Sequence, residues 1–98
     1  MKSVVYHVAA EEELLAAVCH CERERAGRGI RLEALVTRAE KQIRRFPSCG
    51  SNFERGTRRL VLLRLPYSLI YLVQADRCLI VAVAHAKREP GYWRERMR

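Results

Sequence analysis

The feature that most constrains the fold is a change in the spacing of apolar residues near the middle of the 98-residue chain. Between residues 9 and 46 they recur every three or four positions, as they do along one face of a helix. Between residues 58 and 84 they form three short runs, with Pro66 after the first and Ala75 and Asp76 after the second. Connections this short join antiparallel strands. The spacing therefore predicts helices followed by an antiparallel sheet.

The helical part divides at a glycine-rich turn, GRG, which begins at Gly27. We expect the first helix to start at residue 9 or 10, where three glutamates favour the positive end of the helix dipole, and to end before Gly27. The second is expected from residue 30 or 32 to Phe46, just before Pro47. Two helices joined by so short a turn must form an antiparallel hairpin.

Together these elements predict a single α+β domain of two layers over residues 1–98. A strand at 3–8 precedes the helices, and strands at 58–64, 67–73 and 78–84 follow them. A tail that breaks at Pro90 and Gly91 ends in a short helix at 92–98. The N-terminal strand and the helical hairpin pack on a mostly antiparallel sheet of about four strands. One sheet face meets the hairpin, and the other is left for a partner or for chemistry.

The chain is basic, with 19 Lys and Arg against 11 Asp and Glu and a net charge of +8. Residues 1–49 hold 9 basic and 7 acidic residues, a net +2, whereas residues 50–98 hold 10 and 4, a net +6. A small basic domain attracts nucleic acid, anionic membrane or an acidic protein. The charge alone predicts either a polyanion site in the second half or a merely solubilising surface.

Four cysteines do not indicate disulfides or a metal site. The apolar stretch at residues 4–10 is too short for the apolar region of a signal peptide. No apolar stretch approaches the roughly 20 residues of a membrane span. We therefore expect a cytoplasmic protein with reduced thiols, no cofactor and no membrane contact. Cys19 and Cys21 lie too close for structural zinc and point about 200° apart on a helix. Cys78, inside an apolar strand, is expected in the core.

The most informative runs are RRLVLLRLPYSLIYLV at 58–73 and VAVAHAKREPGYWRER at 81–96, which together supply one candidate cluster. His85 stands at the strand end, on the face expected for Leu79, Val81 and Val83, and could accept a proton near neutral pH. Nearby arginines suit phosphate because their planar fork binds it bidentately. RNA cleavage needs such a set of residues: a base, a proton donor and cations. The cations and aromatic residues of this cluster are Arg58, Arg59, Arg64, Lys87, Arg88, Tyr92, Trp93, Arg94 and Arg96.

Each member of this cluster also has a structural interpretation. His85 could cap the strand and bond to the backbone, and Trp93 could anchor the tail over the edge of the sheet. Arg58 and Arg59 could pair with Glu54 or with carbonyls at the sheet edge.

Taken together, the residues resemble the RelE/ParE toxin superfamily of type II toxin–antitoxin systems, which includes plasmid stabilisation proteins. The resemblance covers the opening strand, the helix that begins AAEEEL at Ala9, the glycine turn and the Pro47 loop. It continues with RRL and LPYSLIY within 58–71 and with AVAHAKREPGYWRER at 82–96, its most specific part.

This resemblance implies a growth-inhibiting toxin but not one activity. ParE-like members act on DNA gyrase and are not nucleases, whereas RelE-like members cut mRNA in the ribosome. The HAKREPGYW ending is closer to the ParE branch and favours gyrase. Glu54, in a loop, is the nearest glutamate that could act as a nuclease base. A third alternative is a non-toxic module that only binds its partner. In the nuclease alternative the catalytic residues are His85, Arg64, Arg88 and Tyr92.

The resemblance also implies a cognate antitoxin whose acidic or amphipathic C-terminal segment covers the working surface. DNA is then contacted mainly through the complex, and a dimer or a heterotetramer is compatible with the family. We expect the working surface at the sheet face and tail, not at the helical hairpin. The residues expected to contact the target or nucleic acid are Arg58, Arg59, Lys87, Arg88, Trp93, Arg94 and Arg96.

Overall fold

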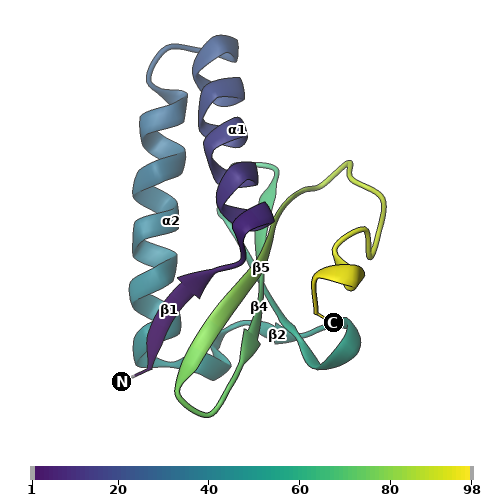
Figure 1. Ribbon diagram of the computed structural model, residues 1–98. Helices are drawn as coiled ribbons and strands as arrows, with labels where there is room; N and C mark the ends of the chain where they lie inside the picture. The colour runs from purple at the N-terminus through teal and green to yellow at the C-terminus, as the bar shows by residue number, and fades with distance from the viewer. Residues whose placement is uncertain (1, 98) are drawn as a thin grey trace.

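Two helices lie side by side on one face of a sheet in the computed structural model, which describes residues 2–97 (Figure 1). The helices are α1 (Val8–Glu24) and α2 (Arg28–Arg45). The strands are β1 (Ser3–Tyr6), β2 (Ser51–Asn52), β3 (Arg58–Val61), β4 (Tyr67–Val73) and β5 (Arg77–His85). Short 3₁₀ helices span Pro47–Cys49, Glu54–Gly56 and Arg94–Met97. Within residues 2–97, no helix is long and apolar enough to cross a membrane.

The order of elements and the packing of the helical hairpin on the sheet confirm the predicted α+β class. Within the described residues the sheet has five strands in the order β1-β5-β4-β3-β2, and β1 runs parallel to β5 while the other pairs are antiparallel. The sequence predicted about four strands. The additional one is β2, because Ser51 and Asn52 of the loop pair with Arg59 and Arg58.

Both helices begin earlier than predicted. The side chain of His7 caps α1, since its Nδ1 accepts a hydrogen bond from the N–H of Ala9 at 3.0 Å, and the helix therefore starts at residue 8. Helix α2 starts at residue 28, so that Gly29 lies inside it rather than in the turn. A Cβ at Gly29 would come 2.7 Å from the carbonyl oxygen of Val18, so this glycine lets the two helices approach closely.

The strand predicted at 58–64 ends at residue 61, because residues 62–66 already turn back toward β4. The N–H of Leu62 donates to the carbonyl oxygen of Tyr67 at 3.0 Å, and Arg64 adopts a left-handed backbone with φ of 67°. The helix predicted at 92–98 is the 3₁₀ turn at Arg94–Met97, and residue 98 lies outside the described residues.

The main core fills the space between the helices and the sheet. Side chains of β4 and β5 that point toward the helices meet the inner faces of α1 and α2. Each fully buried leucine or isoleucine contributes about 1.5–3 kcal/mol, so this layer supplies most of the stability. Cys78 is buried there as predicted, and Cys19 is exposed while Cys21 is buried. The large buried residues of this core are Leu32, Ile43, Leu69, Tyr71 and Ile80.

Tyr71 fixes the chain where it leaves α2. Its hydroxyl donates to the carbonyl oxygen of Pro47 at 2.7 Å and accepts from the N–H of Gly50 at 2.8 Å. Burial raises the pKa of Tyr71 to about 12, so the hydroxyl stays protonated and able to donate. The loop that leads to β2 is therefore held from inside the core.

A β-bulge in β5 changes which residues of this strand face the helices. The register with β4 shifts between Ile70 and Tyr71, which leaves Val81 as an extra residue in β5. His85 pairs with Tyr67, which belongs to the core under the helices, whereas Val81 belongs to the apolar cluster on the opposite face. His85 therefore shares a face with Val83, as predicted, but not with Leu79 or Val81, because the extra residue reverses the alternation beyond it.

Candidate functional site

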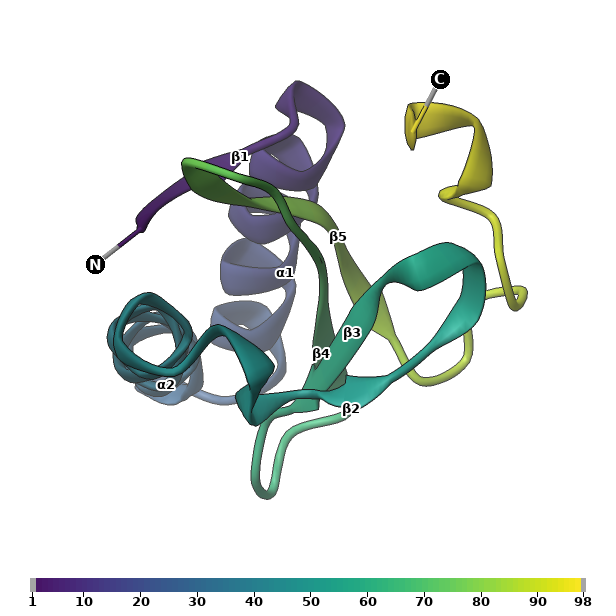
Figure 2. The same ribbon diagram turned by 90° about the horizontal axis from the view of Figure 1, so that it is seen from below.

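The C-terminal segment folds back over the sheet face that the helices leave open (Figure 2). Trp93 anchors it, because its side chain is only 2% exposed and packs with Ile70, Val81 and Ala82. The ring of Phe53 lies 6.1 Å from the Trp93 ring, tilted by 34°. In this structure Trp93 holds the tail on the sheet and presents almost no surface to a target.

Glu13, in the first turns of α1, ties this tail to the bulge in β5. Its Oε1 accepts the N–H of Val83 at 3.0 Å and Nη1 of Arg96 at 2.8 Å, and its Oε2 accepts Nη2 of Arg96 at 2.9 Å. Nη1 of Arg96 also donates to the carbonyl oxygen of Val81 at 3.0 Å. The pairing of β5 with β1 ends at Ile80, so the N–H of Val83 and the carbonyl oxygen of Val81 lie beyond it, and this ion pair satisfies both.

The environment of Glu13 favours its charged form. Burial raises the pKa of this carboxyl group, but the hydrogen bonds and the positive charge around it, chiefly those of Arg96, outweigh burial and hold the pKa below its ordinary value of 4.5. The side chains of Glu13 and Arg96 are only 15% and 17% exposed, so solvent screens the pair weakly.

Tyr92 lies between two guanidinium groups. The guanidinium carbon of Arg88 stands 3.8 Å from the ring centroid and that of Arg96 stands 5.1 Å from it, both at cation–π distance. The Tyr92 hydroxyl is buried beside the Glu13 carboxylate, and within residues 2–97 no partner meets it with good hydrogen-bond geometry. Burial and the neighbouring Glu13 carboxylate raise the pKa of Tyr92, so this hydroxyl is a poor proton donor or acceptor near neutral pH.

Three further arginines of the predicted site also make structural contacts. Nε of Arg94 donates to Oε1 of Glu54 at 3.0 Å within an ion pair. The guanidinium of Arg59 lies 5.2 Å from the centroid of the Phe53 ring. Arg58 donates to the carbonyl oxygen of Gly50 at 2.6 Å and also to that of Ser48. Glu54 thus pairs with Arg94 rather than with Arg58 or Arg59, while Arg58 does bond to loop carbonyls.

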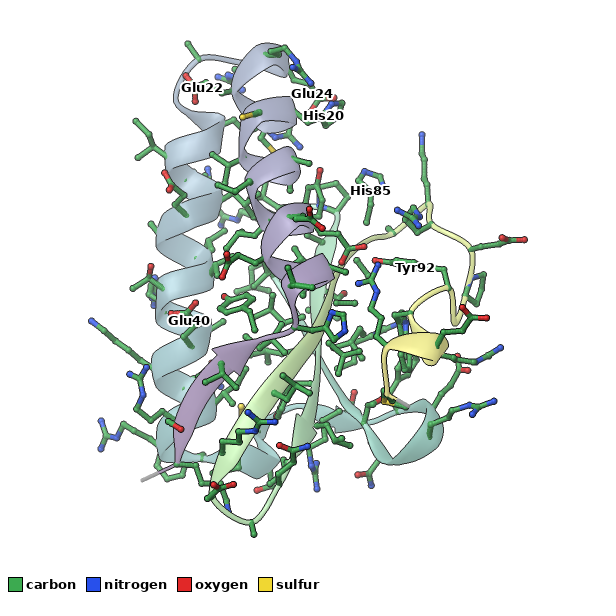
Figure 3. All side chains as sticks on the ribbon, viewed as in Figure 1. His20, Glu22, Glu24, Glu40, His85 and Tyr92 are labelled. Carbon is green, nitrogen blue, oxygen red and sulfur yellow. The ribbon has the colours of Figure 1, made fainter. Side chains whose placement is uncertain are left out.

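The structure brings only part of the predicted set together. A pocket of about 320 Å³ between the tail and the outer sheet face is lined by Arg59, His85, Arg88, Tyr92 and Trp93, together with other tail and sheet residues. The His85 ring stands edge-on against Tyr67 at 5.0 Å, and its Nδ1 accepts the N–H of Lys87 at 3.0 Å. Figure 3 shows the side chains of His85 and Tyr92 at separate places, with Tyr92 nearer the C-terminal segment.

Arg58 and Arg64 do not line this pocket. Arg58 and Arg59 are neighbours on β3, so their side chains leave opposite faces of the sheet. Arg64 lies in the turn after β3 and lines a different pocket, beside the turn between α1 and α2.

Sequence reasoning missed two parts of the site. The sequence predicts for Glu13 only a favourable position at the start of a helix. Nothing near Glu13 in the sequence predicts that it pairs with Arg96, 83 positions further on. The bulge at Val81 has no local signal in the run CLIVAVA.

The fold and the tail-covered sheet define a small, basic α+β domain. A solved structure described as the chromosomal ParDE TA system from P. aeruginosa shares this fold, with a TM-score of 0.77 at 20% identity over 87% of this chain and 96% of that chain. The family model described as "ParE toxin of type II toxin-antitoxin system, parDE" matches residues 4–90. The chain therefore belongs to the ParE toxin family. Comparison with curated proteins found no match.

The family match ends at Pro90, before the residues that close the tail. Tyr92, Trp93, Arg94 and Arg96 thus lie beyond it, although they were part of the motif on which the sequence resemblance rested. Their contacts in this chain are known from its own structure.

We predict that Glu13→Gln destabilises the chain by about 2 kcal/mol near neutral pH, because Arg96 and Val83 lose a charged acceptor. The pKa of Glu13 is lower in the folded chain than its ordinary value of 4.5, so this contribution is complete above that value. It is lost as the pH falls through the lower folded-state pKa. Urea unfolding near neutral pH and at about pH 3 measures both effects.

Glu12→Gln is the matched control, because Glu12 is exposed and adjacent in sequence. It should change the free energy of unfolding by less than about 0.5 kcal/mol at either pH. Equal losses in the two variants would show that the contact with Arg96 does not hold the tail.

Proposed function

We propose that this ParE-family toxin stops growth by acting on DNA gyrase in the cytoplasm, and that a cognate antitoxin neutralises it. The family match supports the toxin class, and ParE-like members are the branch that acts on gyrase. One observation favours gyrase over mRNA: most of the residues that a nuclease would need already make contacts that stabilise the fold.

A ribosome-dependent endoribonuclease would need a base, a proton donor and free cations around one phosphate. Here the Tyr92 hydroxyl is buried, Arg96 is neutralised by Glu13, and Arg94 is paired with Glu54. Arg64 lies at another pocket. While the tail is closed, the candidate nuclease groups that line the pocket beside it are only Arg59, His85 and Arg88. These three groups are too few for a nuclease centre. This favours the gyrase target over mRNA cleavage.

We predict that His85→Ala and Tyr92→Phe keep growth inhibition within about three-fold when the chain is expressed without its antitoxin. A group that transfers a proton in catalysis contributes about 10²–10⁴-fold, so a nuclease that uses either residue would lose nearly all of its activity. Covalently linked gyrase–DNA complexes and primer extension on cellular transcripts measure the two targets in the same cells.

We expect cleaved DNA that is covalently linked to gyrase, and we expect the mRNA in the same cells to stay intact. Cleaved transcripts that disappear in His85→Ala would instead establish the endoribonuclease. Cells that grow normally without the antitoxin would show a non-toxic partner-binding module and would reject the toxin proposal itself.

A shallow groove between α2 and β3 supports a site for the antitoxin. It has a volume of about 140 Å³ and includes Leu35, Leu60, Val61, Leu63 and Arg38 in its lining. Val61 and Leu63 are 53% and 76% exposed, unusual for large apolar residues at neighbouring positions. Strand β2 pairs with only the first two residues of β3, which leaves the rest of this edge open within the described residues. An amphipathic segment with acidic residues fits such a surface.

We predict that Leu63→Glu weakens antitoxin binding at least about ten-fold, because burial of this side chain is lost and a like charge faces the acidic segment. Leu15→Glu on α1, at a position that is 66% exposed, is the control and should change the affinity less than about two-fold. Calorimetric titration of each purified variant with the antitoxin measures this. If both variants and the parent chain bound the antitoxin with equal affinity, the antitoxin site would not be this groove.

A further inference from the structure

Four arginines surround an open pocket at the turn between the helices. Arg25, Arg28 and Arg31 come from this turn and the start of α2, and Arg64 comes from the turn between β3 and β4. The pocket has a volume of about 380 Å³, and Gly27 and Leu65 also line it. The fold thus brings together cations that lie up to 39 positions apart in the sequence.

These arginines have no acidic partner within residues 2–97. The ion pairs of the described residues involve other cations, and no hydrogen bond joins any of these four guanidinium groups to an acceptor. Nε of Arg28 is buried and finds no hydrogen-bond partner in the part of the chain that the structure describes. The tail shows the opposite arrangement, since Arg94 and Arg96 are both paired with glutamates.

The nearest carboxylate serves the backbone instead. Oε2 of Glu22 accepts the N–H of Gly27 at 2.9 Å and Oε1 accepts that of Gly29 at 3.0 Å, so Glu22 caps the start of α2 (Figure 3). The helix N–H groups at this end are therefore partly occupied. The free donors of the pocket are the guanidinium groups.

Local stability does not explain the positions of these arginines. The first turn of α2 contains no acidic residue, and Arg28 and Arg31 stand at the positive end of the helix dipole, where cations are unfavourable. Arg64 has φ of 67°, a backbone conformation that glycine or asparagine adopts more readily. Several residues that break local preferences and converge on one pocket indicate a selected function.

We propose that this pocket binds the phosphate backbone of a nucleic acid. Arginine forks bind phosphate oxygens bidentately, and backbone contacts of this kind need no apolar anchor. An acidic peptide would need apolar contacts for its affinity, and the side chain of Leu65, the one large apolar residue of the lining, is 7% exposed. The chain therefore contacts nucleic acid directly at the hairpin, whereas the sequence predicted DNA contact only through the antitoxin and no working surface at the hairpin.

The double variant Arg31→Gln with Arg64→Gly tests the pocket. Both residues are exposed, and glycine accepts the left-handed backbone at position 64, so the variant keeps its fold. The control is Arg38→Gln with Arg55→Gly. Arg38 lies two turns further along α2, and Arg55 has φ of 56°, so the control loses the same charge from the same kinds of backbone.

Fluorescence anisotropy of the purified chain with labelled duplex DNA and with labelled single-stranded RNA, over a range of salt concentrations, measures binding. The pocket variant should bind about ten-fold more weakly than the parent. The slope of log K against log salt should fall by about 1.8 on duplex DNA or about 1.4 on single strands, which corresponds to two lost phosphate contacts. Comparison of the duplex DNA with the single-stranded RNA shows which of the two nucleic acids the pocket binds.

Equal losses in the pocket and control variants would overturn the proposal, because the affinity would then reflect net charge alone. So would an unchanged affinity in the pocket variant on both nucleic acids. A poly-glutamate peptide with the same charge as the nucleic acids should bind at least ten-fold more weakly than either of them. If it bound equally well, and if this binding depended on Arg31 and Arg64, the pocket would be assigned to an acidic protein. No gyrase or antitoxin is present, so the result is independent of the proposed target.

Discussion

The Glu13 carboxylate joins three parts of the molecule that are distant in sequence: the first turns of α1, the bulge in β5 and the C-terminal tail. Arg96 completes this junction by bonding to both carboxylate oxygens and to the carbonyl oxygen of Val81. Without it, the N–H of Val83 and the carbonyl oxygen of Val81 would lose their partners, and the packing of Trp93 and the Arg94–Glu54 ion pair would be left to hold the tail. The closed tail, and with it the surface offered to a target, depends on this largely buried ion pair.

The sequence predicted the elements well where one local signal decides them. Apolar spacing located the helical hairpin, and the short turns at Pro66 and at Ala75 located the last three strands. It could not predict the bulge at Val81, since inserting one residue among six apolar neighbours changes no pattern. The prediction that His85 shares a face with Leu79 and Val81 was therefore wrong, although it does share one with Val83. The parallel pairing of β1 with β5 is a long-range choice that no local spacing specifies.

The candidate site was predictable in composition but not in arrangement. The excess of cations in the second half suggested one basic surface, yet most of the arginines near the tail contact glutamates, aromatic rings or carbonyl oxygens. Within residues 2–97, the arginines of the hairpin turn, which lie in the less basic half, make no ion pair, and Arg64 joins them only after folding. Charge counted along the sequence cannot separate cations that stabilise the fold from cations that remain available to a ligand.

The central claim is that the tail stays closed on the sheet while the toxin acts, so that its residues build the fold and do not touch the target. Trp93 is the single tryptophan of the chain, and fluorine NMR of the 5-fluorotryptophan-labelled protein observes it alone. The account predicts one resonance that does not shift between H₂O and D₂O, both in the free chain and after addition of gyrase, the proposed target. A solvent isotope shift that develops when gyrase binds would contradict it, because Trp93 would then have left the sheet.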